Sequence, residues 1–257
     1  MPKILTVTDL RIDYPLPGKL PFQAVKGISF DVDENEIFGI VGESGCGKST
    51  VAKALCGLIP TDSGTFSFAD TRRGGVQMIF QDAVGSLNPR KTIGAALEEV
   101  LNVCLGMSAP ERRERIVALL DEVGLPAEVA QAYPRELSGG QCQRISVARA
   151  LAVNPRVIIA DEPVSALDVS VQARVLNLLA DVRQRRNLTV MLISHDLAVV
   201  RTVCDRLIVM NRGEIVERGN AKAVFAHPQH PYTQKLLAAV PDVAAALARH
   251  PAAKENA

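Results

Sequence analysis

The feature that most constrains the fold of this chain is the run Gly42-Glu43-Ser44-Gly45-Cys46-Gly47-Lys48-Ser49, which fits the pattern G-x-x-x-x-G-K-[ST]. Glycines let backbone N–H groups converge on phosphate oxygens without clashes from Cβ atoms, and a helix that follows presents its positive end to the anion. The lysine would reach the β- and γ-phosphates of a nucleotide, and the final serine hydroxyl would bind Mg²⁺. An apolar run, Ile37 to Val41, precedes the motif, and a helical pattern from Lys48 to about Leu58 follows it. The motif in this context predicts a nucleotide site.

A second apolar run, Val157 to Ala160, ends in two acidic residues, Asp161 and Glu162. In proteins with a phosphate-binding loop, such a strand places its aspartate beside the loop, where the carboxylate holds Mg²⁺. The next residue, Glu162, is suited to polarise an attacking water as a general base. Strands often end in acidic turns, so the pattern carries weight only because the phosphate-binding loop precedes it. We expect these two acids to complete a site for nucleotide hydrolysis.

Composition excludes several other classes of protein. The 257 residues are 47% hydrophobic, enough for a large core, and 29 basic against 28 acidic side chains leave a net charge of +1. This balance argues against a strongly basic nucleic-acid binder, and 4% aromatic residues without Trp argue against a stacking platform for single strands. Apolar runs are about four residues long, whereas a membrane span needs about 20. Five widely spaced cysteines without a C-x-x-C pair predict reduced thiols in the cytoplasm, with neither disulfides nor zinc.

Strand and helix patterns divide the chain into regions. Residues 1–40 alternate as β-strands, whereas residues from about 85 to 151 carry long helical patterns. The later elements expected are strands at 157–160 and 189–193, a helix over 168–186, and a hairpin of 206–211 with 214–218 that turns at Arg212-Gly213. These patterns predict an α/β P-loop NTPase with a mainly parallel sheet core, an N-terminal antiparallel β subdomain and an inserted α-helical subdomain. We expect one domain over 1–241 and an Ala-rich, disordered tail over 242–257.

The segment Leu137-Ser138-Gly139-Gly140-Gln141 resembles the signature of the ATP-binding-cassette (ABC) ATPases. A serine and two glycines at a helix N-terminus expose N–H donors and a hydroxyl, which are the features of a second anion site. Taken alone the segment is also compatible with a plain helix cap, but the phosphate-binding loop before it and the acidic strand end after it make the resemblance specific. The resemblance implies that in a dimer this segment closes on the γ-phosphate held by the other subunit.

The same resemblance assigns further residues by their order along the chain. It implies that Gln81 is the Q-loop glutamine, which senses Mg²⁺ or the γ-phosphate and links to membrane subunits, and that His195 is the switch histidine at the γ-phosphate. It places the D-loop, which lies across the dimer, at Ser165-Ala166-Leu167-Asp168. The implied catalytic residues are Glu162, His195, Gln81 and Lys48, and the implied Mg²⁺ ligands are Ser49, Gln81 and Asp161. The implied ATP contacts are Tyr14, which stacks on adenine, and Gly42, Glu43, Ser44, Gly45, Cys46, Gly47, Lys48, Ser49 and Thr50.

Two longer stretches narrow the group within that family. Residues 161–173 (DEPVSALDVSVQA) and 227–233 (HPQHPYT) look like those of oligopeptide, dipeptide and nickel importers. Residues 86–90 and 139–145 are closer to the second, or F-type, ATPase of those systems, and the resemblance runs from about residue 4 to 241. The histidines of the HPQHPYT stretch could be read as a metal pair, but the flanking prolines favour a structural turn.

The chain also departs from the family pattern. Gln81 follows Lys48 by 33 positions, fewer than usual, so the β-hairpin arm between them, Gly64 to Val76, is expected to be trimmed. Some relatives carry a C-terminal cysteine cluster, whereas no cysteine follows Cys204 here, so neither an iron–sulfur cluster nor zinc is expected. We also expect the Cys46 thiol to be reactive, because an amide-lined loop lowers the pKa of a thiol.

The resemblance implies an ATPase that powers import of peptides, nickel or a related small solute, with ATP and Mg²⁺ as cofactors. The implied partners are a paralogous D-type ATPase subunit or a second copy of this chain, two integral membrane permease subunits and, indirectly, an extracytoplasmic solute-binding protein. Nucleic acid is not expected as a partner. The expected location is the cytoplasmic side of the inner membrane, as a peripheral subunit. The solute, the choice between a hetero- and a homodimer, and the direction of transport are not set by the residues themselves.

Two alternatives stay open at this point. One is an ABC-fold ATPase of a soluble complex, such as a phosphonate carbon–phosphorus lyase system, because those relatives share the VSVQA and HPYT stretches. The other is a nucleic-acid-associated ABC ATPase, whose best support is Arg183-Gln184-Arg185-Arg186. That basic run is also explained as a solvated helix end that complements the helix dipole.

Overall fold

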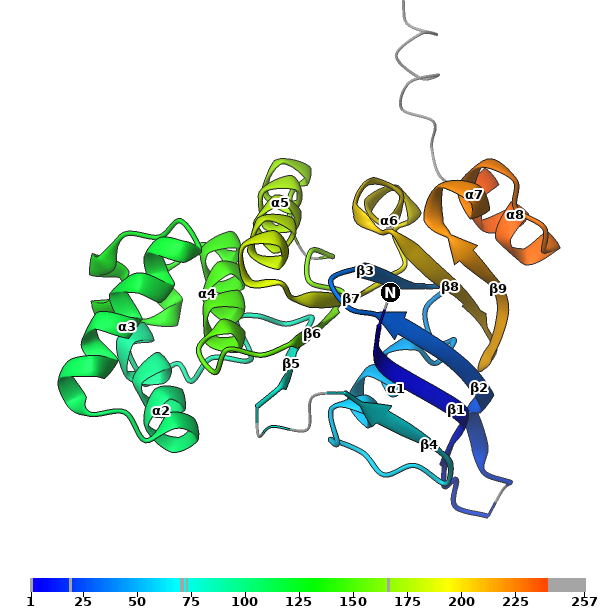
Figure 1. The fold of residues 1–257 in the computed structure, drawn as a ribbon, viewed down its shortest axis with the longest axis horizontal. Helices are drawn as coiled ribbons and strands as arrows, with labels where there is room; N and C mark the ends of the chain where they lie inside the picture. The colour runs from blue at the N-terminus through cyan, green and yellow to red at the C-terminus, as the bar shows by residue number, and fades with distance from the viewer. Residues whose placement is uncertain (1, 19, 70–71, 73, 166, 240–257) are drawn as a thin grey trace, which may run out of the picture.

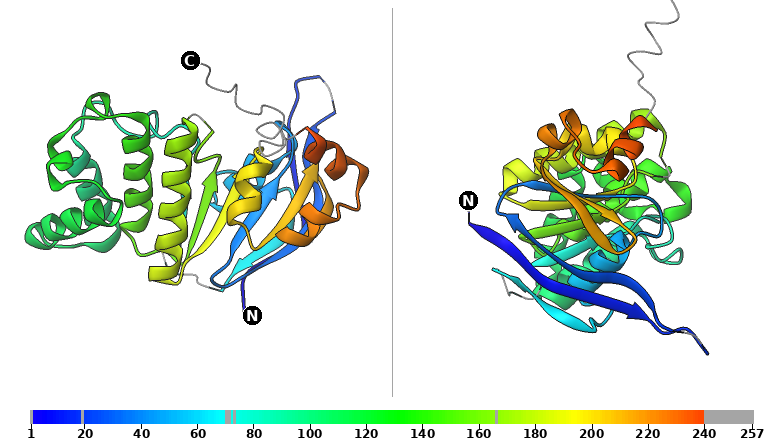
Figure 2. Two further views of the ribbon diagram at one scale, coloured as in Figure 1. Left: turned by 90° about the horizontal axis from the view of Figure 1, so that it is seen from above. Right: turned by 90° about the vertical axis from the view of Figure 1, so that its right-hand side faces the viewer.

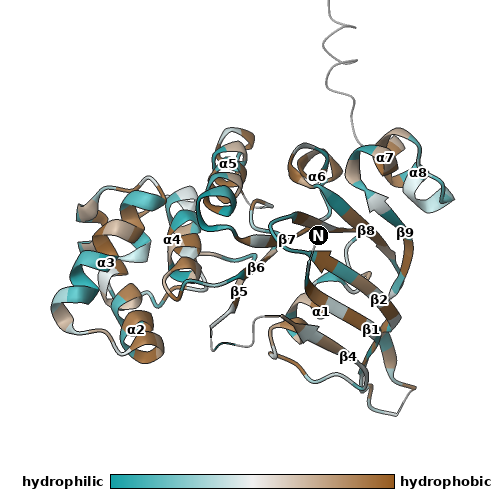
Figure 3. Ribbon diagram, in the orientation of Figure 1, coloured by the Kyte–Doolittle hydropathy of each residue, from teal (hydrophilic) through white to brown (hydrophobic). Residues whose placement is uncertain are grey.

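The computed structural model describes residues 2–18, 20–69, 72, 74–165 and 167–239. Within them, two sheets and a lobe of helices lie side by side along the longest axis of the molecule (Figure 1; Figure 2). The helical lobe occupies one end, and the other end holds the smaller sheet together with the last strand of the larger sheet and the C-terminal helices. The strands β7 (Thr189–Ser194) and β8 (Arg206–Asn211) of the larger sheet are mainly hydrophobic, whereas the helices α3 (Ala109–Glu122) and α5 (Val169–Arg186) mix hydrophobic and hydrophilic residues (Figure 3). None of the helices in these described ranges has the length and the apolar composition that crossing a membrane requires.

The smaller sheet is antiparallel and has the strand order β2-β1-β4. Its strands are β1 (Lys3–Tyr14), β2 (Phe22–Asp33) and β4 (Ser63–Phe68). In β1 the side chains of Leu5 and Val7 are buried, and so are those of Leu10 and Ile12. The spacing of three between Val7 and Leu10 coincides with a register shift, so a β-bulge keeps both pairs on the inner face. This confirms the expected N-terminal antiparallel subdomain.

The larger sheet has the order β5-β6-β7-β3-β8-β9, and its first five strands are parallel. These strands are β5 (Val76–Ile79), β6 (Val157–Asp161), β7 (Thr189–Ser194), β3 (Ile37–Val41) and β8 (Arg206–Asn211). The last strand, β9 (Glu214–Asn220), pairs antiparallel with β8 through the expected turn, where Arg212 and Gly213 have φ values of 49° and 85°. Two successive positive φ values match the right-handed twist of a two-residue hairpin.

The helix α1 (Lys48–Leu55) lies between the two sheets and contacts β2 and β6. The sequence pattern suggested an end at about Leu58, but the helix ends at Leu55. The reason is that Gly57 turns the chain with a φ of 69°. Around α1, Phe30 of β2 stacks on Phe38 of β3 with ring centroids 5.7 Å apart. This contact joins the two sheets into one core.

The helical lobe contains α2 (Ile93–Leu105), α3 (Ala109–Glu122) and α4 (Gly139–Leu151), with short 3-10 turns at Ala127–Gln131 and Pro134–Glu136. The helices α5 (Val169–Arg186) and α6 (Leu197–Val203) pack on the larger sheet, and α7 (Ala221–Ala226) and α8 (Pro231–Ala238) follow β9. The guanidinium of Arg186 donates to Glu122 and Asn154, so it ties α5 to the lobe.

Between Lys48 and Gln81, the residues that the structure describes form one strand of the expected arm. Strand β4 pairs with the middle of β1, from Leu5↔Phe68 to Arg11↔Ser63, and β5 begins at Val76. Residues 70, 71 and 73, which belong to the Gly64–Val76 prediction, lie outside the described residues, as does all of the expected tail over 242–257.

Candidate functional site

The candidate functional residues lie at the ends of three neighbouring strands, at one edge of the larger sheet. Ile193 of β7 pairs with Asp161 of β6 on one side and with Ile40 of β3 on the other. The carboxyl ends of these parallel strands therefore meet, which is where an open α/β sheet binds its ligands. The phosphate-binding loop leaves β3, the acidic pair ends β6, and His195 follows β7.

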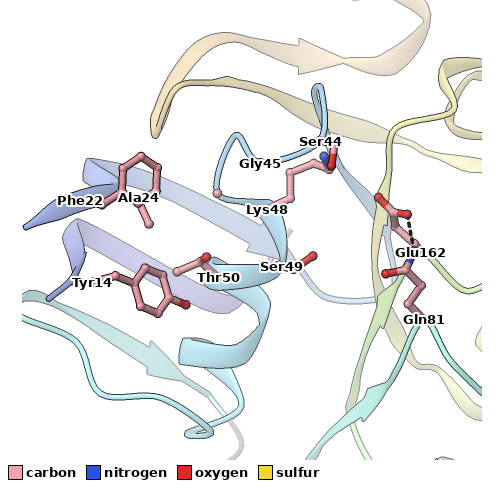
Figure 4. Close-up of a pocket in the computed structure, with 11 residues that line it drawn as sticks. Tyr14, Phe22, Ala24, Ser44, Gly45, Lys48, Ser49, Thr50, Gln81 and Glu162 are labelled. Atoms are coloured by element: carbon pink, nitrogen blue, oxygen red, sulfur yellow. Dashed lines mark hydrogen bonds between the residues drawn. The ribbon is translucent and has the colours of Figure 1, made fainter. Parts of the chain in front are cut away.

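The phosphate-binding loop is held in shape by its own lysine. The Lys48 side chain is 4% exposed, and its Nζ donates to the carbonyl oxygens of Gly42, at 2.7 Å, and Glu43, at 2.8 Å. In Figure 4 this side chain extends from α1 towards Ser44 along the loop. A cation that already lies over the loop is well placed to meet the negative charge of a phosphate.

Glycine is required at both ends of the loop because backbone atoms approach it closely. A Cβ atom on Gly42 would lie 2.2 Å from the carbonyl oxygen of Met210, and one on Gly47 would lie 2.4 Å from that of Ala24. Gly47 also has a φ of 107°, which side chains rarely adopt. The loop is thus seated against the ends of β8 and β2.

A hydroxyl and a carboxylate meet at the start of α1. Ser49 Oγ donates to Asp161 Oδ1 over 2.8 Å, although the two residues are 112 positions apart. Asp161 is 5% exposed, and burial raises the pKa of its carboxyl, while the bond from Ser49 acts in the opposite direction. Keeping a buried carboxylate charged costs free energy unless a positive group lies beside it. Asp161 is therefore suited to bind a cation.

Two of the residues assigned from the sequence contact the carboxylate of Glu162. Gln81 Nε2 donates to Glu162 Oε2 over 3.0 Å, and His195 Nδ1 lies 3.0 Å from Glu162 Oε1. Figure 4 shows the first of these contacts across the pocket from Lys48 and Ser49. Glu162 has a φ of 47°, an uncommon conformation for a residue with a side chain. The structure therefore brings Gln81, Glu162 and His195 together.

An aromatic wall forms the other end of the same pocket (Figure 4). Tyr14 of β1 pairs directly with Phe22 of β2, and their side chains are 40% and 53% exposed. The pocket is lined by Tyr14, Phe22, Ala24, Ser44, Gly45, Gly47, Lys48, Ser49, Thr50, Gln81 and Glu162. The sequence analysis missed Phe22 and Ala24. Their signal was the alternation of the strand, since residues two apart share a face.

The signature segment lies away from the phosphate-binding loop of its own chain. Ser138 caps α4: its Oγ accepts from the Gln141 backbone N–H over 3.2 Å, and its own N–H donates to Gln141 Oε1 over 2.9 Å. Gly140 lies against α5, where an added Cβ would come within 2.5 Å of Val171. None of Leu137, Ser138, Gly139, Gly140 and Gln141 lines the pocket of Figure 4. Gly139 lines a second hollow instead, together with Gln81 and Leu167.

The expected D-loop runs from the acidic pair to α5. Ser165 Oγ donates to the Glu162 carbonyl oxygen over 3.2 Å and accepts from Gln81 Nε2 over 3.4 Å. Asp168 is the N-cap residue of α5. Ala166 lies outside the described residues. Ser165 thus joins the contacts that surround Glu162.

The expectation of a reactive Cys46 is wrong for this structure. The thiol is 5% exposed, and burial raises its pKa, although the nearby Lys48 charge acts in the opposite direction. The loop amides do not reverse this, because the side chain turns away from the pocket into the core between the sheets. Desolvation of the thiolate outweighs the favourable charge.

With this geometry in place, similarity to known proteins identifies the family. Residues 25–165 match the ABC transporter family, and residues 216–257 match the oligopeptide/dipeptide transporter C-terminal region. The chain is 44% identical to the oligopeptide transport ATP-binding protein OppF of Escherichia coli (strain K12), over 93% of this chain and 78% of that protein. It is 44% identical to the dipeptide transport ATP-binding protein DppF of Haemophilus influenzae, over 96% of this chain and 80% of that protein. The chain belongs to the ABC transporter family.

Solved structures of ABC cassettes have the same fold. The dimeric, post-hydrolysis form of the ATP-binding cassette MJ0796 bound to ADP and Pi has a TM-score of 0.75 and 30% identity, over 84% of this chain and 98% of that one. The cbiO1 protein of Clostridium perfringens, described as part of the ABC transporter complex cbiONQ, has a TM-score of 0.78 and 26% identity, over 96% of this chain and all of that one. The ABC ATPase fold expected from the sequence is confirmed, and the chain is an ABC-type ATPase.

We expect the substitution Gly47→Ala to weaken ATP binding at least 100-fold, because the new Cβ would collide with the Ala24 carbonyl oxygen and force the loop out of shape. Titration with a fluorescent ATP analogue measures the effect. The matched control is Gly57→Ala, which has a φ of 69° but no described atom within 4 Å of the added Cβ. It should lower the free energy of unfolding by about 1 kcal/mol and leave ATP affinity unchanged. Equal ATP affinity in both variants would show that close approach to Ala24 does not shape the loop.

We expect N-ethylmaleimide at neutral pH to modify the exposed Cys104 at least about tenfold faster than Cys46. A raised pKa means that less of the Cys46 thiol is present as the reactive thiolate, and burial hinders access of the reagent. Mass spectrometry of peptides from time points of the reaction gives both rates. Comparable rates would contradict the burial of Cys46.

Proposed function

We propose that this chain is the ATP-hydrolysing subunit of an importer for oligopeptides or dipeptides. The observation that carries the proposal is the gathering of Lys48, Asp161, Glu162 and His195 at one sheet edge, in a chain whose C-terminal region also matches the oligopeptide/dipeptide transporter family. The names of the relatives, OppF and DppF, support ATP-driven peptide import. Nickel is compatible with the family but less specifically supported, and the soluble lyase-type complex is not favoured by these relatives.

In the proposed site, the loop N–H groups and Lys48 hold the phosphates of ATP, while Tyr14 and Phe22 contact the adenine. Preorganised donors of this kind stabilise the charge that develops during phosphoryl transfer. The Ser49 hydroxyl and the Asp161 carboxylate supply the hard oxygen ligands that Mg²⁺ prefers, and Gln81 supplies a further amide oxygen. The donors present therefore fit Mg²⁺, which would neutralise phosphate charge when bound.

Glu162 is proposed to orient and polarise the attacking water. Its two carboxylate oxygens contact Gln81 Nε2 and His195 Nδ1, so these two side chains are proposed to fix the direction in which the carboxylate presents its charge. The side chain of His195 is 53% exposed, so it is accessible to a γ-phosphate. Positioning and electrostatics account for most of the catalysis in such sites.

The site is proposed to be completed by a second subunit. The signature segment, Leu137 to Gln141, and the D-loop at Ser165, Leu167 and Asp168 lie outside the pocket that holds the phosphate-binding loop of this chain. The dimeric structure of the related cassette MJ0796, bound to ADP and Pi, supports the pairing of two such subunits. The proposed partner is a paralogous D-type ATPase or a second copy, and either would make an isolated protomer a poor ATPase.

The proposed assembly is peripheral on the cytoplasmic side of the inner membrane. Two integral membrane permease subunits would bind this chain directly, and an extracytoplasmic solute-binding protein would act through them. Within the chain, the proposed division is an ABC domain over 1–241, with the helical subdomain inserted over about 85–151, and a tail over 242–257.

The decisive experiment for the transport function is purification of the chain from gently solubilised native membranes. Two multi-span subunits and a paralogous ATPase in the same complex, followed by ATP-dependent uptake of labelled peptides by the reconstituted complex, are the expected results. Recovery with soluble proteins alone would leave the ATPase chemistry in place and refute peptide import.

The role of Glu162 has its own test. We expect Glu162→Gln to keep ATP binding, to accumulate an ATP-bound dimer in size-exclusion chromatography and to slow ATP turnover at least about 100-fold, because the amide cannot take a proton from water. The matched control is Glu128→Gln at an exposed site in the helical lobe, which should change neither property. Turnover within a fewfold of the unmodified protein would remove Glu162 from the proposed role.

A further inference from the structure

The C-terminal HPQHPYT stretch, which the proposed reaction does not use, makes a direct contact with the phosphate-binding loop. The hydroxyl oxygen of Tyr232, the second residue of α8, accepts a hydrogen bond of 3.1 Å from the backbone N–H of Glu43. The two residues are 189 positions apart. Glu43 does not line the nucleotide pocket, so this N–H group is directed to α8 and not to the phosphates.

The contact completes the support of one particular peptide group. The carbonyl of Gly42 and the N–H of Glu43 belong to the same peptide unit. Lys48 Nζ donates to that carbonyl over 2.7 Å, and Tyr232 accepts from that N–H. The peptide is therefore fixed from both sides, by α1 on one and by α8 on the other.

Tyr232 is itself held firmly by the turn that precedes it. His230 is the N-cap of α8, and its Nδ1 accepts from the Tyr232 backbone N–H over 3.1 Å. The N–H groups of Gln229 and His230 donate to the two carboxylate oxygens of Glu217 on β9, over 2.8 and 3.1 Å. The turn is thus fastened to the larger sheet, so the tyrosine hydroxyl has a defined position relative to the loop.

We propose that Tyr232 is a positioning residue of the nucleotide site, whose hydroxyl oxygen holds the Gly42–Glu43 peptide so that the following loop N–H groups point into the pocket. The physical reason is the glycine content of the loop. Glycines lose more conformational freedom on ordering than other residues, and a loop that is ordered before the ligand arrives binds it at a lower entropic cost. Burial raises the pKa of Tyr232, which favours its neutral hydroxyl, although the hydrogen bond from the Glu43 N–H acts in the opposite direction. This inference rests on the proposed ATP site.

The substitution Tyr232→Phe removes the acceptor and keeps the ring. In the nucleotide-free full-length protein, we expect the amide of Glu43 to exchange with solvent about tenfold faster, while the amide of Val51, which donates to the Gly47 carbonyl, is unchanged. Affinity for ATP should fall about fivefold, which corresponds to the net contribution of about 1 kcal/mol of one hydrogen bond. The KM for ATP should rise by a similar factor with kcat at saturating ATP within twofold, because the contact shapes the loop and touches no reacting atom.

The matched control is Tyr133→Phe, which removes a tyrosine hydroxyl from the helical lobe and should leave both measurements unchanged. A second variant, Glu217→Gln, acts through the turn. The N–H groups of Gln229 and His230 donate to different oxygens of Glu217, and an amide keeps only one of those two oxygens. The variant should therefore shift Glu43 exchange in the same direction as Tyr232→Phe. Unchanged exchange of Glu43 in Tyr232→Phe, or unchanged ATP affinity, overturns the proposal. Failure of the unmodified protein to bind ATP would refute the ATP site separately, because the exchange measurement needs no nucleotide.

Discussion

The parallel pairing of β6, β7 and β3 is the constraint on which the remaining geometry depends. These strands are buried on both faces, so a slip of one residue would carry a full set of apolar side chains out of their packing positions. Because Ile193 pairs with both Asp161 and Ile40, the acidic pair, the phosphate-binding loop and His195 emerge at the same level. Core packing, more than the loops themselves, therefore sets the distances between the groups proposed for catalysis.

Much of this arrangement followed from local patterns. The phosphate-binding loop, the acidic strand end and the Arg212-Gly213 hairpin each show their identity within a short stretch of sequence, because each depends on a local requirement for glycine, charge or alternation. The pairing order of the strands is less local, but parallel strands joined by helices leave few alternatives. The fold class, and the meeting of these segments at one edge of the larger sheet, were therefore within reach of the sequence.

Other features depend on contacts between distant segments, so a local pattern is not sufficient to place them. Phe22 faces the pocket only because it pairs with Tyr14 across a hairpin whose register is shifted by bulges. Cys46 was expected to be reactive from its neighbours in the sequence, whereas the packing of two sheets around α1 decides its burial. The contact between Tyr232 and Glu43 requires knowledge of where α8 lies relative to the loop, which the HPQHPYT stretch by itself does not provide.

The helical lobe is attached to both ends of α5, a helix that also packs on the larger sheet. Close packing of Gly140 on Val171 attaches the N-terminal end of α4 to the first turn of α5, immediately after the expected D-loop. At the other end of the helix, Arg186 binds Glu122 of α3 and Asn154. A rotation of the helical lobe would therefore carry the signature segment and the start of α5 as one unit.

The two contacts on Glu162 have a consequence of their own. Gln81 follows β5 at the border of the helical lobe, and His195 follows β7 in the centre of the larger sheet. Both side chains nevertheless contact the same carboxylate, that of Glu162. If Glu162 orients the attacking water as proposed, the orientation of its carboxylate depends on both contacts at once. On that proposal, displacement of either Gln81 or His195 would misalign the carboxylate and slow ATP hydrolysis.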